Sequence, residues 1–375
     1  MPEVVHRLTA QDARRVAVRA QLLDAERPTS VEQVLHRLTL LQDDPCAAVV
    51  PSAHLVLWSR LGSAYDPAEL DAAVTSGLVV ELHQMLRPAA DIALHRAGMA
   101  NWPAVFDQYR DVHDALARWV AANDDTRRDI LEKLYDEGPV TSRALPDTTL
   151  VPWRSSGWNG DRNVRMLLEN MVGRGEVAVA GRGGPGGRDK LWDLAERVYP
   201  DDPVPDLEDA RRELDRRRLA GLGIARGRAA VVPGEPTAVG EAGEAAVVEG
   251  VRGRWRVDPA YLQDLDGFEG RVAVLSPIDR LVIDRKRMVE LFAFDYQLEM
   301  FKPAAKRRWG YWAMPVLVGD RLLGKVDATA ERDRGVLRVD AIHEDEPFDR
   351  RTRAAVRAEV EALAHWLDLE PELPG

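Results

Sequence analysis

The sequence predicts an α+β protein in which helical segments dominate the first two thirds and a strand-rich region comes last. Apolar residues recur at helical spacing in several segments before residue 225, and short strands follow at residues 78–86 and 175–180. After residue 270, short apolar runs are separated by tight turns such as Gly319-Asp320, which is typical of a small β-rich domain.

Composition limits the class of protein. The chain has 375 residues, of which 45% are hydrophobic and 30% charged, as in a soluble protein with two or three domains. No run approaches the roughly 18 apolar residues of a membrane span, and the charged first 19 residues predict no signal peptide. The single cysteine, Cys46, excludes an internal disulfide framework and a cysteine-based metal site. We therefore expect a cytoplasmic protein.

The formal net charge of −11 counts against strong non-specific binding to nucleic acid. Local basic clusters can still provide a DNA footprint on an acidic chain. Their positions therefore matter more than the total charge.

The first segments have the order of a winged helix-turn-helix. Thr9 and Asp12 form a capping-box pattern before a helix that reaches residue 23, and Ser30 caps a second helix over residues 31–41. Asp66-Pro67 opens a third helix, and residues 78–86 form the extended wing. His83 and Gln84 on this wing are candidate DNA contacts, or else ordinary polar wing residues.

A second set of elements repeats this pattern. Residues 119–124 form a link, followed by predicted helices over 125–137, 141–145 and 163–172 and strands over 175–180 and 190–194. The glycine run between the strands contains G-x-G-x-x-G, but a dinucleotide-binding motif must open a helix, whereas this run joins two strands. It therefore predicts a wing loop, in which Arg182 and Arg188 are candidate DNA contacts.

The last third contains the clearest strand signals. A basic helix over residues 211–222 follows the proline-rich linker 200–205, and a strand is expected at 271–280. A helix over 284–291, a hairpin of strands 314–318 and 321–327, and a closing helix over 349–367 complete the prediction.

Basic and aromatic residues alternate between residues 306 and 312. This pattern suits binding of a nucleic-acid strand or an extruded base, so Lys306, Arg307, Arg308 and Trp309 are candidate contacts. The alternative is a packed strand whose Lys and Arg stems cover apolar surface.

The segment Gln42-Asp43-Asp44 carries the candidate chemistry. An apolar helical run delivers these polar groups onto Pro45, so the helix is expected to end near Asp43. The side-chain amide of Gln42 can both donate and accept hydrogen bonds, and the carboxylate of Asp44, two residues later, only accepts them. Together these two groups can hold and polarise one water molecule.

The same segment, followed by His54-Leu55-Val56-Leu57-Trp58-Ser59-Arg60-Leu61-Gly62, resembles the signature of the winged-helix YcaQ/AlkZ-type DNA glycosylases. That family removes alkylated bases and unhooks interstrand crosslinks, and its motif is Gln, an apolar residue, then Asp or Gln. The resemblance assigns the two catalytic positions to Gln42 and Asp44. It departs at Asp43, where the family has an apolar residue.

The resemblance extends over most of the chain and implies a domain order. It places winged helices at residues 1–118, 119–200 and 201–270, and a β-rich domain with a closing helix at 271–375. It implies a monofunctional, metal-independent glycosylase without cofactors that acts on alkylated or crosslinked double-stranded DNA. The sequence contains no heptad pattern that would indicate an obligate dimer, so we expect a monomer. We expect it to be associated with the nucleoid.

Two alternatives remain open from the residues. A DNA-binding regulator with winged helices but no catalysis is favoured by Asp43 in the middle of the motif. A metal-dependent nuclease would use Asp43 and Asp44, although adjacent side chains seldom converge on one ion.

Overall fold

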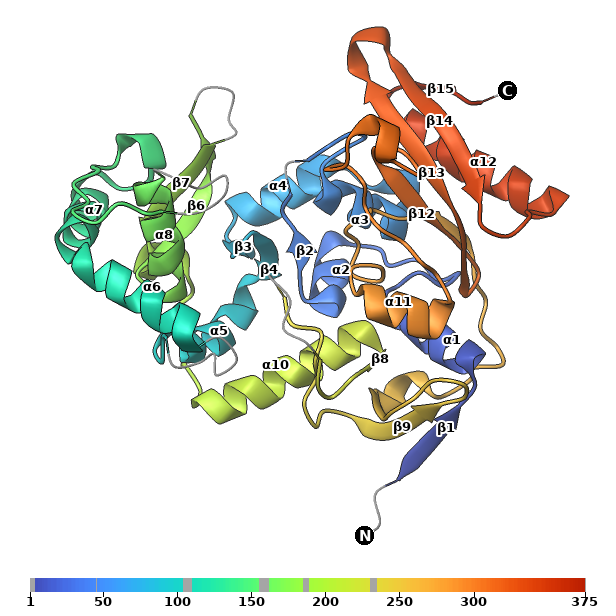
Figure 1. Ribbon diagram of the computed structural model, residues 1–375, viewed down its shortest axis with the longest axis horizontal. Coiled ribbons are helices and arrows are strands. Elements are labelled where there is room, and N and C mark those ends of the chain that lie inside the picture. The colour runs from blue at the N-terminus through green and yellow to red at the C-terminus, as the bar shows by residue number, and fades with distance from the viewer. Residues whose placement is uncertain are drawn as a thin grey trace. The chain divides into compact units, whose positions relative to one another are not determined.

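The structure is a computed structural model that describes residues 4–44, 46–103, 110–154, 162–184, 189–229 and 235–374. It confirms a mixed α+β fold (Figure 1). The chain divides into two compact units, the first formed by residues 1–69 and 215–375 and the second by residues 70–214. Within the described ranges, none of the helices has the length and apolar content needed to cross a membrane.

The helices that begin the first unit follow the predicted capping signals. Helix α1 (Ala10–Ala20) begins at the capping box of Thr9 and Asp12, and α2 (Val31–Leu38) begins at Ser30. Helix α3 (Ser52–Leu61) follows the short strand β2 (Leu41–Gln42). The helix starts predicted at Thr9 and Ser30 are therefore confirmed, whereas the sequence analysis did not predict α3.

Two sheets occupy the described part of the first unit. In the first sheet, β1 (Val5–Leu8) pairs in parallel with β9 (Glu244–Val248), and β10 (Trp255–Val257) and β8 (Ile224–Ala225) extend it. The N-terminal strand thus shares a sheet with residues almost 240 positions later. The core beneath it combines apolar residues of α1 with Trp255, Val257 and Leu275.

The second sheet confirms the predicted β-rich C-terminal region. Its order is β11-β12-β13-β14-β15, with every pair antiparallel except β14–β15. Its strands are Val272–Val274, Ala313–Val318, Arg321–Glu331, Val336–Glu344 and Glu370–Glu372. Helix α11 (Arg285–Phe292) precedes β12, and α12 (Arg350–Trp366), capped by Asp349, packs against β11 and β15 (Figure 1).

The second unit is built around a sheet in which β4, β3, β6, β7 and β5 lie in that order. Those strands are Met85–Pro88, Val79–Leu82, Val177–Gly183, Asp189–Leu194 and Val140–Thr141. Its helices are α5 (Ile92–Met99), α6 (Arg110–Ala122), α7 (Asp124–Glu137), α8 (Asn163–Gly173) and α9 (Ala195–Val198). Helices α4 (Pro67–Thr75) and α10 (Leu207–Leu222) cross the unit boundaries.

Five local predictions are corrected. The helix predicted to reach residue 41 ends at Leu38, because Thr39 adopts a left-handed conformation with φ of 66° that closes it. The strand predicted over 78–86 is a hairpin. His83 and Gln84 form its two-residue turn, with φ values of 53° and 62°, which suits a type I′ turn.

The other corrections concern short segments. The predicted link at residues 119–124 is the end of α6 and the start of α7, with Asn123 between the two helices. The indole of Trp119 and the side-chain amide of Asn123 donate hydrogen bonds to the carbonyl of Val151. The predicted helix over 141–145 is a short strand followed by a single 3-10 turn. Residues 306–312 are a loop after the 3-10 turn Ala304–Lys306, and they do not form a strand.

The division into two units differs from the linear order of four predicted domains. The difference arises because the first 69 residues share sheets and core with residues 215–375. The winged-helix character of the individual segments remains a prediction.

Candidate active site

Gln42 and Asp44 lie on a non-helical segment that begins with β2, where the sequence predicted a helix end. Gln42 ends β2, and Asp44 follows two residues later, both half-buried. Asp44 Oδ1 accepts a hydrogen bond of 2.8 Å from the N–H of Cys46, so the carboxylate closes a local turn. Burial, together with this carboxylate, raises the pKa of the Cys46 thiol. Pro45, which was expected to end the helix, lies outside the described residues.

The segment is supported from both ends. Leu40 and Leu41 are buried, which fixes the chain just before Gln42. On the far side of Asp44, the carbonyl of Ala48 accepts a 2.8 Å hydrogen bond from the N–H of Ala330 in β13, and Arg332 donates to the carbonyl of Val49. The candidate residues therefore lie on a loop that is docked against the C-terminal sheet.

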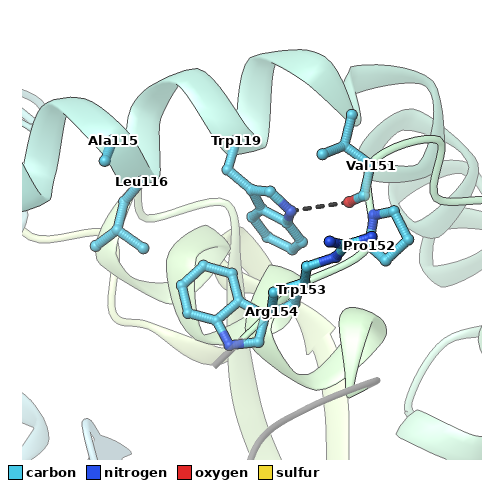
Figure 2. Close-up of a pocket in the computed structure, with 7 residues that line it drawn as sticks. All are labelled: Ala115, Leu116, Trp119, Val151, Pro152, Trp153 and Arg154. Atoms are coloured by element: carbon cyan, nitrogen blue, oxygen red, sulfur yellow. Dashed lines mark hydrogen bonds between the residues drawn. The ribbon is translucent and has the colours of Figure 1, made fainter. Parts of the chain in front are cut away.

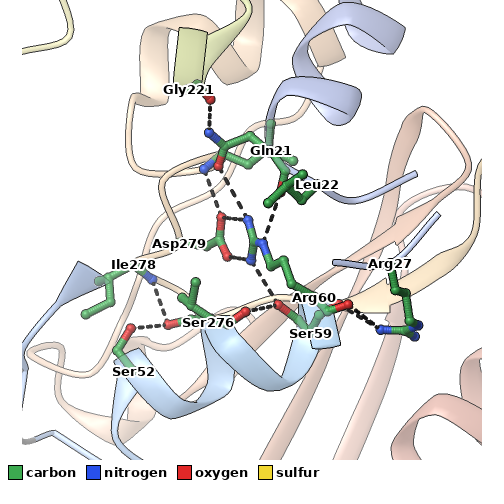
Figure 3. Close-up of polar contacts among 12 residues, drawn as sticks. Gln21, Leu22, Arg27, Ser52, Ser59, Arg60, Gly221, Ser276, Ile278 and Asp279 are labelled. Atoms are coloured by element: carbon green, nitrogen blue, oxygen red, sulfur yellow. Dashed lines mark hydrogen bonds and ion pairs between the residues drawn. The ribbon is translucent and has the colours of Figure 1, made fainter. Parts of the chain in front are cut away.

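The motif that follows on α3 has a structural role centred on Arg60. Arg60 and Asp279 form an ion pair in which both side chains are 0% exposed (Figure 3). The Arg60 guanidinium also donates to the carbonyl of Gln21 at 3.1 Å and to the hydroxyl of Ser59 at 2.9 Å. The motif thus connects α3 to the segment after β11 and to the end of α1.

Other polar groups of α3 make similar long-range contacts. The hydroxyls of Ser52 and Ser276 lie 2.7 Å apart, at the start of the helix (Figure 3). His54 Nδ1 lies 2.9 Å from the hydroxyl of Tyr65, whose ring stacks on Trp366 of α12. These contacts hold α3 in place, and α3 in turn packs against β2, which carries Gln42.

The candidate contacts of the second unit differ in their surroundings. His83 and Gln84 are exposed at the tip of the β3–β4 hairpin. Arg182 on β6 donates to the buried carboxylate of Glu81 at 3.0 Å, and Lys190 on β7 also pairs with Glu81. The negative charge of Glu81 thus compensates part of the positive charge on the β6–β7 hairpin. Arg188 lies outside the described residues.

The basic residues near position 306 lie on a loop that we call the basic loop, residues 302–312. Lys306 and Arg308 are exposed, and Arg307 is half-buried with its guanidinium 5.0 Å from the ring centre of Tyr311. The carboxylate of Glu299 accepts the N–H groups of Arg308 and Trp309 at 2.6 and 2.8 Å. Asp327 accepts the N–H of Trp312 at 3.0 Å. The loop is therefore held by buried acids beneath exposed cations.

Trp309 supports this loop from inside. It is 8% exposed, and the ammonium of the buried Lys325 lies 4.5 Å from its ring centre. Burial lowers the pKa of Lys325, against the opposing effect of its partner Asp345. In this conformation Trp309 is a packing residue, while Lys306 and Arg308 are exposed and Arg307 is half-buried.

We expect the stability of the loop to depend on pH through Glu299. Burial would raise the pKa of Glu299, but hydrogen bonds from Lys302, Trp309 and Arg308 outweigh it and lower the pKa below the ordinary 4.5. A depressed pKa in the folded state gives stability that is present above pH 4.5 and is lost as the pH falls through the folded value.

Glu299→Gln is expected to lower the unfolding free energy by about 1–3 kcal/mol at pH 7. In urea titrations, this difference should shrink below pH 4.5. A difference independent of pH would contradict this role.

A separate cavity lies in the second unit. It has a volume of about 420 Å³ and is lined by α6 and residues 151–154 (Figure 2). The rings of Trp119 and Trp153 meet edge to face at 5.0 Å there, and the indole of Trp119 donates to the carbonyl of Val151. None of the predicted site residues lines it. The described residues also contain no group of three His, Cys, Asp or Glu side chains arranged to hold a metal ion.

Sequence reasoning missed the residues that support the site. Arg60 is part of the family-like motif and Asp279 lies in the segment 271–280 predicted as a strand, but nothing in the sequence pairs them across 219 positions. Glu299 and Asp327 had no signal beyond their charge, because their role depends on which backbone N–H groups the fold brings to them.

Two comparisons with known proteins bear on identity. A family model described as DNA glycosylase AlkZ-like matches residues 35–366, a range that includes Gln42, Asp44, Arg60 and the basic loop. Among solved structures, the chain is similar to the DNA glycosylase AlkZ of Streptomyces sahachiroi, with a TM-score of 0.63, 14% sequence identity and 98% of each chain covered. The structural likeness supports the fold, and the family match spans most of the chain. The chain therefore belongs to the AlkZ-like DNA glycosylase family.

Proposed function

We propose that this protein is a monofunctional DNA glycosylase that hydrolyses the N-glycosidic bond of alkylated purines, with Gln42 and Asp44 as its catalytic residues. The observation that carries the proposal is the family match, which includes this segment and supports a DNA glycosylase role in DNA repair. Interstrand crosslinks formed through alkylated purines are proposed as further substrates, since the bond to be broken is the same.

The chemistry requires a carboxylate and a positioned water molecule. Breaking an N-glycosidic bond develops a sugar cation like that of glycoside hydrolysis. Asp44 would stabilise this cation and accept a proton from the attacking water, which Gln42 would orient. An alkylated purine is cationic and leaves readily, so the reaction needs no strong general acid.

The end of α2 before this segment supports this pairing. On a helix, side chains two residues apart do not face each other. The early end of α2 at Leu38 therefore favours cooperation between Gln42 and Asp44. Because the Cys46 N–H bonds Oδ1 of Asp44, that carboxylate is held in one orientation while Oδ2 lies outside this hydrogen bond.

An assay of base release tests the proposal against both alternatives. Duplexes with a single alkylated purine, and crosslinked duplexes, are incubated with the protein with and without a chelator. We expect abasic sites in both conditions. A DNA-binding regulator would bind without releasing a base, and a metal-dependent nuclease would cut the backbone only without chelator. Either of those results would replace this proposal.

Binding should depend on the basic loop. Replacing Lys306, Arg307 and Arg308 by Ala removes three positive charges from the basic loop and is expected to reduce the salt dependence of duplex binding by up to about 3 units of log–log slope. Fluorescence anisotropy at several salt concentrations measures this slope. The control replaces the exposed Arg350, Arg351 and Arg357 of α12, which changes the net charge equally. Equal slopes in the two triple variants would assign the basic loop to packing.

A further inference from the structure

Phe301 is an apolar side chain displayed in a basic setting. It is 85% exposed, more than any other large apolar residue that the structure describes. It lies between α11 and the basic loop, next to Lys302, and the segment from Glu299 to Arg308 contains four basic residues and one acid. A phenyl ring this exposed adds little stability to the fold, since it removes little apolar surface from water.

The backbone presents Phe301 in a defined way. The N–H of Lys302 donates to the carbonyl of Glu299 at 2.8 Å, which closes a four-residue turn with Phe301 at its third position. The side chain of Lys302 returns to the carboxylate of Glu299 at 2.8 Å, and this same carboxylate holds the N–H groups of Arg308 and Trp309. The phenyl ring therefore projects from a turn that is tied to the base of the basic loop.

The basic loop and the Gln42–Asp44 segment meet the same edge of β13. The pairing of β12 with β13 ends at Ala313 opposite Asp327. The basic loop, which comes just before Ala313 in the chain, lies at that end of the pair. The N–H of Ala330, three residues further along β13, donates to Ala48 of the candidate catalytic loop. Three residues of strand span about 10 Å. A duplex engaged by one loop is thus within reach of the other.

We propose that Phe301 inserts into the base stack of duplex DNA beside the lesion, while Lys306, Arg307 and Arg308 hold the flanking phosphates. This inference rests on the proposed function. A damaged nucleotide must be displaced from the stack, or the duplex distorted, before its glycosidic bond can be reached. Apolar side chains inserted between base steps stabilise such distortion, and aromatic rings stack on any base.

The first test compares rates on two substrates. Phe301→Ala is expected to release an alkylated base from a duplex about 10- to 100-fold more slowly than wild type, the loss of one stacking contact. Release from the same strand without its complement should change little, since no stack needs opening. Phe301→Trp should restore the duplex rate. The control, Val289→Ala, removes apolar surface that is 53% exposed on α11 and should leave both rates unchanged.

A second readout does not require base release. 2-Aminopurine placed opposite the lesion should brighten when Asp44→Asn protein binds the duplex, and it should stay dim with Asp44→Asn/Phe301→Ala. Brightening that persists in the double variant, or equal losses on single and double strands, would overturn the insertion. Brightening without any base release from wild type would instead refute the proposed glycosylase activity and leave insertion standing.

Discussion

The Asp44→Asn variant is expected to release alkylated bases at least about 100-fold more slowly than the wild type. The substitution removes the negative charge that would stabilise the sugar cation, and it removes the base that would accept the proton of water. Asn retains an oxygen that can accept the 2.8 Å hydrogen bond from the Cys46 N–H, so the local turn should persist. Single-turnover release from an alkylated duplex measures the loss.

Binding provides the control for this variant. Duplex affinity should be equal or slightly higher in Asp44→Asn, because an acidic group near the phosphates has been removed. Asp43→Leu, which supplies the family's apolar middle residue, should leave activity equal or raise it. If Asp43→Ala abolished release while Asp44→Asn did not, the assignment of the catalytic carboxylate would be wrong by one residue.

Arg60→Met is expected to lower the unfolding free energy by about 3–5 kcal/mol. The substitution leaves the Asp279 carboxylate, which is 0% exposed, without its partner in the protein interior. Urea-induced unfolding followed by tryptophan fluorescence measures the change. The double variant Arg60→Met/Asp279→Asn should recover part of the loss, because no charge is then buried alone.

A surface ion pair of the same unit is the matched control. Arg321 and Glu346 pair with side chains that are 50% and 54% exposed, so Arg321→Met should cost under about 1 kcal/mol. If Arg60→Met were no more destabilising than Arg321→Met, the buried pair would not hold α3 in place. A destabilised α3 would also disturb β2, so base release should fall with stability in Arg60→Met.

The helix boundaries were predictable where short polar side chains cap them. Thr9, Ser30, Asp284 and Asp349 each accept the backbone hydrogen bond expected of an N-cap, because this interaction depends only on residues within one turn. The strand pair around Gly319-Asp320 was predictable for the same reason.

The end of α2 was not predictable in this way. Leu40 and Leu41 continue the apolar pattern of the helix, and a short apolar run fits a helix and a strand equally well. The left-handed conformation of Thr39 decides between them, and it is rare for a β-branched residue. The turn at His83 and Gln84 was not predictable from its residues either, because a type I′ turn usually uses Asn or Gly.

The sequence by itself determined the α+β class, the starts of the capped helices, the candidate pair Gln42 and Asp44, and the basic residues near position 306. These depend on local chemistry and on the family motif. The tertiary structure decided what surrounds them. It paired Arg60 with Asp279, placed Glu299 under the basic loop and brought Ala48 to β13. The contacts of Arg60 with Asp279 and of Ala48 with β13 join residues far apart in the chain, and all three depend on the packing of the whole unit, which no local pattern encodes.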